Sequence, residues 1–205
     1  MKVKFRRSCQ DDLDQVYELH TRCFSNPDQW YKSAIKHHLN KGIVVEVVKT
    51  NLTKIIGVLL QGTITPCNRA IVDDCDSYDT SNDNLFGLET KTETIGKTEG
   101  YKEDVFEPVS ENGKLFLENN VHFKDLYGIV MICVDPEYRG KGLAKKLIEK
   151  HWKNSSDKIV CLNTRRSNIG AFMLYKSIGY EHVANIKNKY FLPTEDSIFM
   201  IKELV

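Results

Sequence analysis

The sequence predicts a single α/β domain, built around one mixed, mostly antiparallel sheet with helices on its flanks. Near the N-terminus a strand, two helices and a hairpin follow one another, and after residue 125 strands alternate with helices. With 205 residues, 41% of them hydrophobic, the chain is long enough to bury one substantial core. We therefore treat 1–205 as one domain, with an acidic insertion at about 66–124 between its third and fourth core strands.

The first 65 residues hold the N-terminal elements. Ser8, with Asp11 or Asp12, indicates a helix start. Asn26-Pro27-Asp28 ends that helix and caps the next one, which Gly42 closes. We expect strands at 2–7, 43–48 and 54–65, and helices over about 8–24 and 29–39.

The insertion differs from the rest of the chain in composition. Residues 73–124 carry 13 Asp and Glu against 5 Lys, and the remainder has nine more Lys and Arg than acids. So long a loop in a compact domain is either functional or disordered. Apolar islands at 85–86, 105–106 and 115–117 indicate that parts of it pack on the core. Residues 107–113 are rich in turn-forming residues. The basic remainder suits a polyanionic cofactor or a phosphorylated acceptor. No nucleic-acid motif is present, so no nucleic-acid partner is expected.

The stretch 129–148 is the organising element. Its apolar run to Val134 predicts a buried strand, which Asp135-Pro136 ends. Arg139-Gly140-Lys141-Gly142 then leads into a helix that reaches about Asn154. Such a turn aims free N–H groups and the helix dipole at one point, and glycine lets an anion approach closely, so the turn suits a phosphate. An ordinary tight turn is the alternative.

After this helix we expect strands at 158–162, 181–189 and 197–204. A helix over 168–178 lies between the first two, and Gly179 ends it.

Two motifs resemble the GCN5-related N-acetyltransferase (GNAT) superfamily. Arg139-x-x-Gly142-x-Ala144 resembles its acyl-CoA pyrophosphate motif, and Asn168-x-x-Ala171-x-x-x-Tyr175-x-x-x-Gly179-Tyr180 resembles its second signature, in the same order and at the same separation. The resemblance covers 2–65 and 125–204 and leaves the insertion unmatched. It implies the GNAT fold, in which the sheet is splayed open after the central strand.

The resemblance also implies acetyl-CoA as co-substrate and no metal. The pantetheine arm would pair with the strand end at 132–134, whose backbone groups would otherwise lack partners, and the pyrophosphate would bind the amides of 139–144. Tyr175 would be the general acid that protonates the departing thiolate, although a core tyrosine is the alternative. The implied cofactor-binding residues are Ile132, Cys133, Val134, Arg139, Gly140, Lys141, Gly142, Leu143, Ala144, Asn168, Phe172 and Tyr175.

The implied reaction is direct attack of a neutral primary amine on the thioester, and two kinds of acceptor compete. The stretches 26–31 and 186–196 resemble protein N-alpha-acetyltransferases, but Gly128 and Asn163 stand where that family has a tyrosine and a histidine to handle the amine proton. In overall organisation the chain is similar to the atypical glucosamine 6-phosphate N-acetyltransferases of parasitic protists, and we favour that phosphorylated small-molecule acceptor. Lysine, polyamines and a non-catalytic acyl-CoA-binding module are the further alternatives.

The acceptor side has less distinctive residues. Arg165 and Arg166, just beyond a strand end, would clamp the acceptor phosphate. The expected acceptor-binding residues are Tyr31, Asn163, Arg165 and Arg166. Asp125 is the first choice for a general base, ahead of Glu46, His122 and Tyr127. His37 and His38 are expected on a solvated helix face.

The remaining features concern cysteines and location. The six cysteines show no Cys-x-x-Cys pair, so we expect reduced thiols and no metal site. The N-terminus lacks the apolar core of a signal peptide, and no apolar run approaches the ~20 residues of a membrane span. We therefore expect a cytoplasmic protein with no membrane span. The oligomeric state stays open, with a homodimer among the options.

Overall fold

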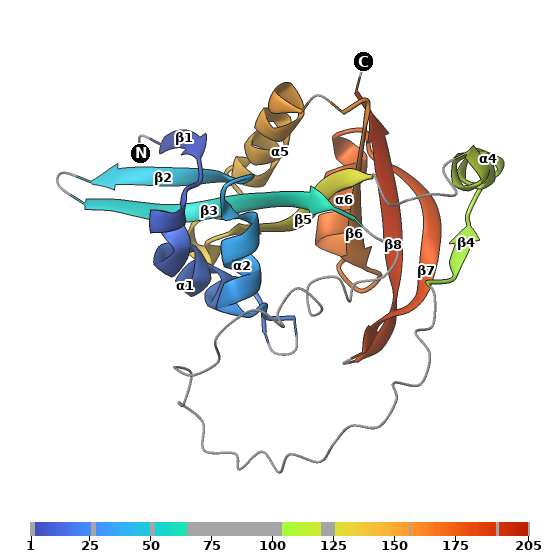
Figure 1. Ribbon diagram of the computed structural model, residues 1–205, viewed down its shortest axis with the longest axis horizontal. Helices are drawn as coiled ribbons and strands as arrows, with labels where there is room; N and C mark the ends of the chain where they lie inside the picture. Colours follow the sequence, from blue (N-terminus) through green and yellow to red (C-terminus); the bar gives the residue numbers. More distant parts are fainter. Residues whose placement is uncertain are drawn as a thin grey trace, which may run out of the picture.

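The computed structural model describes residues 3–25, 28–49, 52–64, 104–119, 126–155, 157–191 and 193–204. These residues form one eight-stranded sheet in the order β1-β2-β3-β5-β6-β8-β7-β4 (Figure 1). All neighbouring strands are antiparallel except β5 and β6. The strands are β1 Val3–Arg7, β2 Ile43–Lys49, β3 Leu52–Thr63, β4 Phe106–Pro108, β5 Tyr127–Val134, β6 Ile159–Arg165, β7 Glu181–Phe191 and β8 Thr194–Glu203. The mixed, mostly antiparallel sheet is therefore confirmed.

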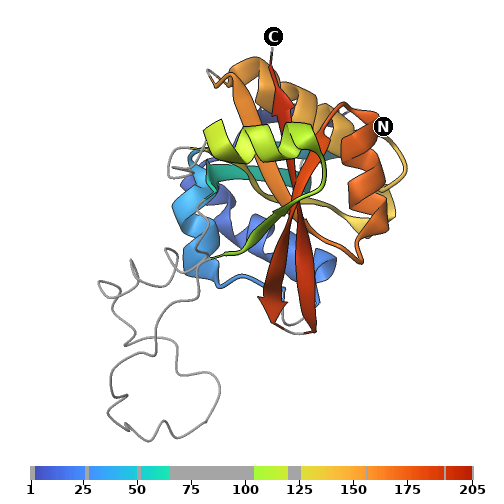
Figure 2. The same ribbon diagram turned by 90° about the vertical axis from the view of Figure 1, so that its right-hand side faces the viewer.

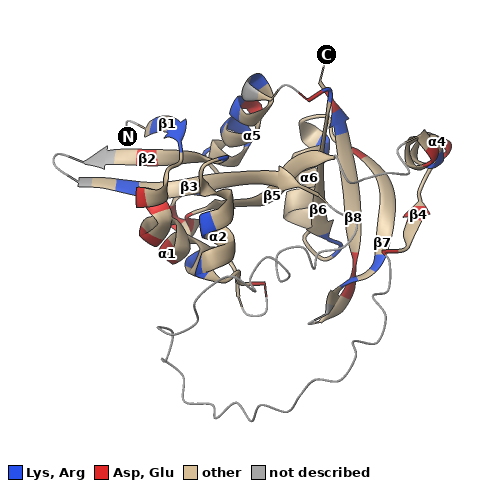
Figure 3. Cartoon of the chain, in the orientation of Figure 1, with Lys and Arg blue, Asp and Glu red and all other residues tan. Residues whose placement is uncertain are grey.

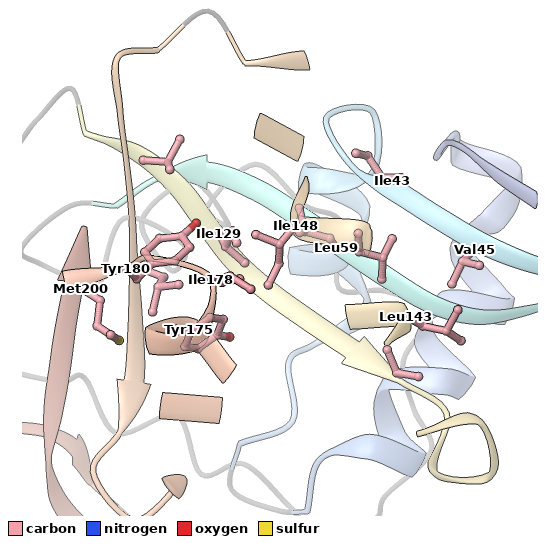
Figure 4. Packing of buried hydrophobic residues seen from close by; sticks show 14 of the residues in the cluster. Ile43, Val45, Leu59, Ile129, Leu143, Ile148, Tyr175, Ile178, Tyr180 and Met200 are labelled. Carbon is pink, nitrogen blue, oxygen red and sulfur yellow. The ribbon is translucent and has the colours of Figure 1, made fainter. Parts of the chain in front are cut away.

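Helices cover both faces of this sheet (Figure 1). Apolar side chains of α1 and α2 pack on one face of β2, β3 and β5, while those of α5 and α6 pack on the other. On the second face, Leu143 and Ile148 of α5 and Tyr175 of α6 lie over Leu59 and Ile129 of the sheet (Figure 4). The helices are α1 Leu13–Cys23, α2 Lys32–Leu39, α4 Glu111–Asn119, α5 Leu143–Asn154 and α6 Ile169–Ser177, and 3-10 turns span Gln10–Asp12 and Pro136–Tyr138.

Two N-terminal boundaries differ from the prediction. Ser8 does not cap α1, because its hydroxyl donates to the Leu39 carbonyl. Cys9 opens the helical segment instead, in a capping box with Asp12, whose carboxylate accepts from the Cys9 amide at 2.8 Å and from Arg6 at 2.6 and 2.7 Å. The second helix begins at Lys32 rather than 29. A local capping box one residue later than predicted, together with pairing to Arg6, thus fixes the entry to α1.

The C-terminal part of the insertion is more ordered than predicted. The turn-rich reading of 107–113 is wrong, because β4 adds an edge strand to β7 and α4 follows it (Figure 2). The rings of Phe106 and Phe116 lie 5.6 and 6.4 Å from Phe199, which confirms that these two islands pack on the core. The third island, at 85–86, lies outside the described residues.

The sheet is joined narrowly between β5 and β6. Over the described lengths of both strands, only Gly128↔Cys161 and Ile129↔Leu162 pair. A Cβ on Gly128 would lie 1.9 Å from the Cys161 carbonyl oxygen, so the backbones approach closely there. On the other side of β5, Gln61 faces Ile129 and Leu60 faces Met131, which leaves the intervening residue as a β-bulge. The strand ends beyond this junction diverge, and the predicted splay is confirmed.

Candidate active site

The turn after β5 forms an open cradle of backbone amides. Gly140 and Gly142 have φ of 73° and 71°, and a Cβ on either would meet nothing within 4 Å. Gly142 caps α5, whose first helical hydrogen bond runs from the Lys146 amide to the Gly142 carbonyl at 3.1 Å. The amides of residues 143–145 precede that bond, so they point out of the helix end. This geometry fits a pyrophosphate.

The buried carboxylate of Asp135 anchors the cradle. It accepts from the Glu137 amide at 3.1 Å, and Arg22 and Lys54 lie 3.2 and 3.1 Å from its second oxygen. Burial alone would raise the pKa of Asp135, but Lys54, the Glu137 amide and Arg22 outweigh it and hold the pKa below its ordinary value. Asp135 therefore stays ionised and fixes the turn to β3 and α1.

The Arg139 side chain folds back onto the end of β5. Its Nε donates to the Val134 carbonyl at 3.1 Å, and the Cys23 thiol donates to the same oxygen at 3.4 Å. The expectation that this carbonyl lacks a protein partner is therefore wrong. Arg139 thus positions the strand end, while the cradle is made by main-chain groups.

Cys23, at the end of α1, is a residue that the motifs did not single out. A hydrogen bond with Cys133 lowers the pKa of Cys23 most, burial opposes that effect, and Arg139 lowers it further, to about 7. The pKa of the buried Cys133 thiol is raised well above its ordinary value, through Cys23 and through burial. All four cysteines within the described residues are free thiols, and Cys133 and Cys161 are buried in strands, as predicted. Only the fold brings Cys23 beside Arg139, so no sequence spacing could have found it.

Tyr175 lies in α6, buried beside the opening. Its ring centroid is 5.7 Å from that of Tyr180 (Figure 4). Burial first, then the neighbouring Tyr180 and Tyr190, raise the pKa of Tyr175. The phenol therefore keeps its proton at neutral pH. It packs as a core residue, and it is chemically able to donate a hydrogen bond to a sulfur atom.

The other predicted cofactor residues of α6 have structural contacts. The Asn168 side-chain oxygen accepts from the Ala171 amide at 3.2 Å, so Asn168 caps α6. Phe172 packs edge-on against His182, with ring centroids 5.8 Å apart. In the cradle, Lys141 lies over the Tyr138 ring at 4.9 Å, while Leu143 and Ala144 pack into the core.

Arg165 is not a free phosphate ligand. It is the last residue of β6 rather than a residue beyond the strand. Its guanidinium donates to the two carboxylate oxygens of Asp28 at 2.8 and 2.5 Å, and Glu195 lies 3.3 Å away. The hydrogen bond with Asp28 raises the pKa of Arg165 despite partial burial. Two carboxylates therefore already form ion pairs with this guanidinium.

The other predicted acceptor residues are dispersed. Arg166 is 68% exposed at its side chain and lies 4.0 Å from Asp196. Asn163, on β6, accepts from the Ser197 hydroxyl at 3.4 Å. Tyr31, at the start of α2, is 84% exposed. The fold thus brings Asn163, Arg165 and Arg166 to one strand end and leaves Tyr31 in solvent.

The structure describes only two of the four candidate general bases, Glu46 and Tyr127. Asp125 and His122 lie outside the described residues. Glu46 is buried on β2 and bound by Arg6 at 2.6 Å, so it is not available as a base. Burial first, then Asp157, raises the pKa of Tyr127.

Two histidines on the α1–α2 face are buried instead. The prediction that His38 is solvated is wrong: its Nδ1 lies 3.2 Å from the Gln61 carbonyl, and Gly62 leaves room for its ring. His20 was not singled out, and its Nε2 accepts from the Trp30 amide at 2.7 Å. Burial lowers the pKa of both, so both are neutral at pH 7.

Among the described residues, no three His, Cys, Asp or Glu side chains are grouped to hold a metal ion. Within the same residues, no helix has the length and apolar character to cross a membrane. The cytoplasmic location and the homodimer stay predictions.

Comparison with known proteins agrees with this geometry. Residues 107–182 match the family model described as Acetyltransferase (GNAT) domain. N-alpha-acetyltransferase RimI of Mycobacterium tuberculosis is 29% identical over 77 residues, which are 38% of this chain and 49% of that protein. The matched segment thus spans about half the length of this relative.

Solved structures share the fold over nearly the whole chain. NAA60 of Arabidopsis thaliana, in complex with acetyl-CoA, has a TM-score of 0.63 at 18% identity, covering 99% of this chain and 100% of that one. The ribosomal-protein-S18-alanine N-acetyltransferase of Escherichia coli has a TM-score of 0.59 at 15% identity, covering 98% and 94%. The chain therefore has the fold of these acetyltransferase structures, and its residues 107–182 match the GNAT domain model.

Proposed function

We propose that this protein is an acetyl-CoA-dependent N-acetyltransferase that transfers an acetyl group directly to a primary amine. The observation that carries the proposal is the amide cradle at Gly140 and Gly142, placed directly beside the divergent ends of β5 and β6. A pyrophosphate on the cradle would set the attached pantetheine arm along the opening, and the thioester supplies an activated acetyl group. Backbone amides near the end of β5 would stabilise the developing oxyanion.

The role proposed for Tyr175 follows from its protonation state. Its pKa is raised by burial, whereas a thiol ordinarily titrates near ~8.5. A phenol that holds its proton more tightly than a thiol stabilises the departing thiolate by donating a hydrogen bond to it. Tyr175 would therefore lower the barrier to expulsion of CoA without itself becoming ionised.

For the acceptor we propose an α-amine, as at a peptide N-terminus. An α-amine ionises near ~7.7–8.0, so a large fraction is neutral at pH 7.5 and little help from a base is needed, unlike lysine at ~10.4. Two similar proteins are named for α-amino or alanine N-acetylation, and a further similar structure, a NatC complex, is bound to a peptide and CoA. Arg165 is already paired with two carboxylates, so it is a weak binding partner for the phosphate of a phosphorylated acceptor.

Glucosamine 6-phosphate, the acceptor expected from the sequence, is the second candidate. Its support is Arg166, a largely exposed cation at the same end of β6, 4.0 Å from the nearest carboxylate oxygen of Asp196.

Thiol release from acetyl-CoA tests both candidates. We expect turnover with short peptides that have a free N-terminus, and none with the same peptides after chemical N-acetylation. Turnover with glucosamine 6-phosphate and with no peptide would show that the acceptor is the amino sugar and not an α-amine. Binding of acetyl-CoA without turnover of any amine would contradict the enzyme assignment and favour a non-catalytic acyl-CoA-binding module.

Tyr175→Phe should lower kcat by about 10- to 100-fold, because the hydrogen bond to the leaving sulfur is lost, while the Kd for acetyl-CoA changes little. Tyr180→Phe is the matched control, since it removes a second buried hydroxyl from the same ring pair. Equal losses of kcat in the two variants would assign Tyr175 to packing alone. Steady-state kinetics and calorimetric titration of CoA give the two readouts.

A further inference from the structure

Arg165 ties together three segments that are distant in the sequence. Asp28 lies between α1 and α2, while the Pro193 carbonyl, just before β8, and Glu195, in the first residues of β8, each lie 3.3 Å from Nη1. The guanidinium also lies 4.1 Å from the centre of the Tyr190 ring. Its side chain is 14% exposed, so these contacts form a largely enclosed ion-pair bridge.

The bridge lies at the place where the sheet separates. The last β5–β6 pair is Ile129↔Leu162, and β6 continues without a β5 partner to Arg165. Cys23 contacts the end of β5 through the Val134 carbonyl, and Asp28 contacts the end of β6 through Arg165. These two contacts, from sites close in sequence, anchor one segment to both sides of the opening.

The bridge receives Asp28 from the α1–α2 side of the sheet, whereas the amide cradle leads into α5, which packs on the other side. Asp28 belongs to the connection between α1 and α2, which pack on one face, whereas α5 and α6 pack on the other. In Figures 1 and 2 the tip of the β7–β8 hairpin extends toward the level of α1 and α2. If the cofactor arm enters from the α5–α6 face, the bridge stands where an acceptor would approach from the other face.

The two carboxylates that contact Arg165 disfavour an anion on its guanidinium. Asp28 and Glu195 both contact Arg165, and Asp196 lies beside Arg166 and Lys187. Acidic and basic positions lie close together along the lower parts of β7 and β8 in Figure 3. Burial would raise the pKa of Glu195, but hydrogen bonds from Ser167 and Arg165 lower it, so this carboxylate is ionised at neutral pH. A phosphate that sought Arg165 would have to displace two carboxylates and stay close to both.

We propose that the Asp28–Arg165–Glu195 bridge is a specificity determinant, which closes the acceptor side of the sheet opening and excludes amines with a phosphate next to the reacting group. This inference rests on the proposed function, and it refines the acceptor class to amines without a neighbouring anion. Arg165 acts here as a positioning residue and does not touch the reacting atoms.

The test compares two peptides that differ only in a phosphate: one begins with serine and the other with phosphoserine. The variant is Asp28→Asn, which removes one bridge carboxylate at constant size. Asp14→Asn is the matched control, because Asp14 is an exposed carboxylate on α1 that pairs with Lys32 at 2.6 Å. We expect the wild type to favour the serine peptide by tenfold or more in kcat/KM, the factor that ~1.4 kcal/mol provides.

Asp28→Asn should reduce that preference by about tenfold, since it frees one side of Arg165, and Asp14→Asn should leave it unchanged. Equal use of the two peptides by the wild type, or equal behaviour of the two variants, would overturn the proposal.

A second measurement does not depend on turnover. Inorganic phosphate, titrated into each full-length protein saturated with CoA, should bind more tightly to Asp28→Asn than to the wild type or Asp14→Asn. If no peptide is acetylated although CoA binds, the proposed function fails, and this titration still decides whether Asp28 shields Arg165. Identical phosphate affinities in all three proteins would overturn the shielding. Thermal unfolding of each variant confirms that it is folded.

Discussion

Cys23 shows how the sheet opening changes the chemistry of a single side chain. Its thiol lies between Cys133, the Val134 carbonyl and Arg139, at the end of α1. Hydrogen bonding with Cys133, opposed by burial and supported by Arg139, brings its pKa to about 7. The thiolate is the reactive form of cysteine, so the lowered pKa and the partial exposure of Cys23 both favour its alkylation.

We predict that iodoacetamide modifies Cys23 faster than the exposed Cys9 at pH 7, and that the rate rises as the pH passes through about 7, where the thiolate becomes the major form. Peptide-resolved mass spectrometry after timed alkylation gives both rates. Arg139→Gln should slow the modification of Cys23 at pH 7, because a cation that stabilises the thiolate is gone. Faster labelling of Cys9 at every pH would contradict the lowered pKa.

Residues with a local geometric role were easier to predict than those with distant partners. Gly140 and Gly142 must adopt positive φ between a strand and a helix, and that requirement is visible in a short stretch of sequence. Arg165 and His38 were misjudged because their partners, Asp28 and the Gln61 carbonyl, lie far away in the chain. A charge beside a strand end looks solvated until the fold supplies its counter-ion.

At the scale of elements, the junction between β5 and β6 depends on Gly128. The Cys161 backbone lies where a Cβ would stand, so any larger residue must push the two strands apart. The junction has only two residue pairs over the described lengths of the strands.

Gly128→Ala should therefore lower the free energy of unfolding by about 2 kcal/mol or more, as overpacked core sites do. Gly170→Ala is the control, since a Cβ there meets nothing within 4 Å and alanine favours the α6 helix by about 0.5–1 kcal/mol. Urea denaturation of both variants measures the difference. An unchanged stability of Gly128→Ala would mean that the strands can separate there at no cost.

The sequence predicted most elements but not β4, α4 or the β5 bulge. Strands and helices with a clear apolar period were located to within a few residues. β4 has only three residues and α4 contains Asn112 and Gly113, so neither shows a strong pattern. Both form because β7 offers an edge and Phe199 a packing surface. The bulge is an interruption in the pairing of β3 with β5, so the sequence of one strand alone cannot reveal it.

At the scale of the whole molecule, three buried histidines couple stability to pH. His20, His38 and His151 come from α1, α2 and α5, on both faces of the sheet, and burial lowers the pKa of each. Neither nitrogen of His151 has a hydrogen-bond partner within the described residues. Below pH ~6.5, the unfolded chain takes up protons on these histidines that the folded chain does not.

We therefore predict that the free energy of unfolding falls as the pH is lowered from about 7 to 5, by up to ~1.4 kcal/mol per pH unit for each histidine. Denaturant titrations at several pH values measure the slope. His151→Phe should lower this slope by up to ~1.4 kcal/mol per pH unit, because one buried histidine is removed. Substitution of the exposed His37 by glutamine is the control and should leave the slope unchanged. A stability that stays constant over this range would contradict the lowered pKa values. Carboxylates with lowered pKa, such as Asp135, act only at still lower pH.

The two-pair contact between β5 and β6 also has a mechanical consequence. It divides the sheet into two half-sheets, β1-β2-β3-β5 and β6-β8-β7-β4, that meet along a short seam. A molecule bound between the divergent ends of β5 and β6 would contact both half-sheets and hold them together. The ion pairs of Arg165 with Asp28 and Glu195 are a second connection between the two halves of the molecule. Occupancy of the opening and rigidity of the molecule should therefore rise together.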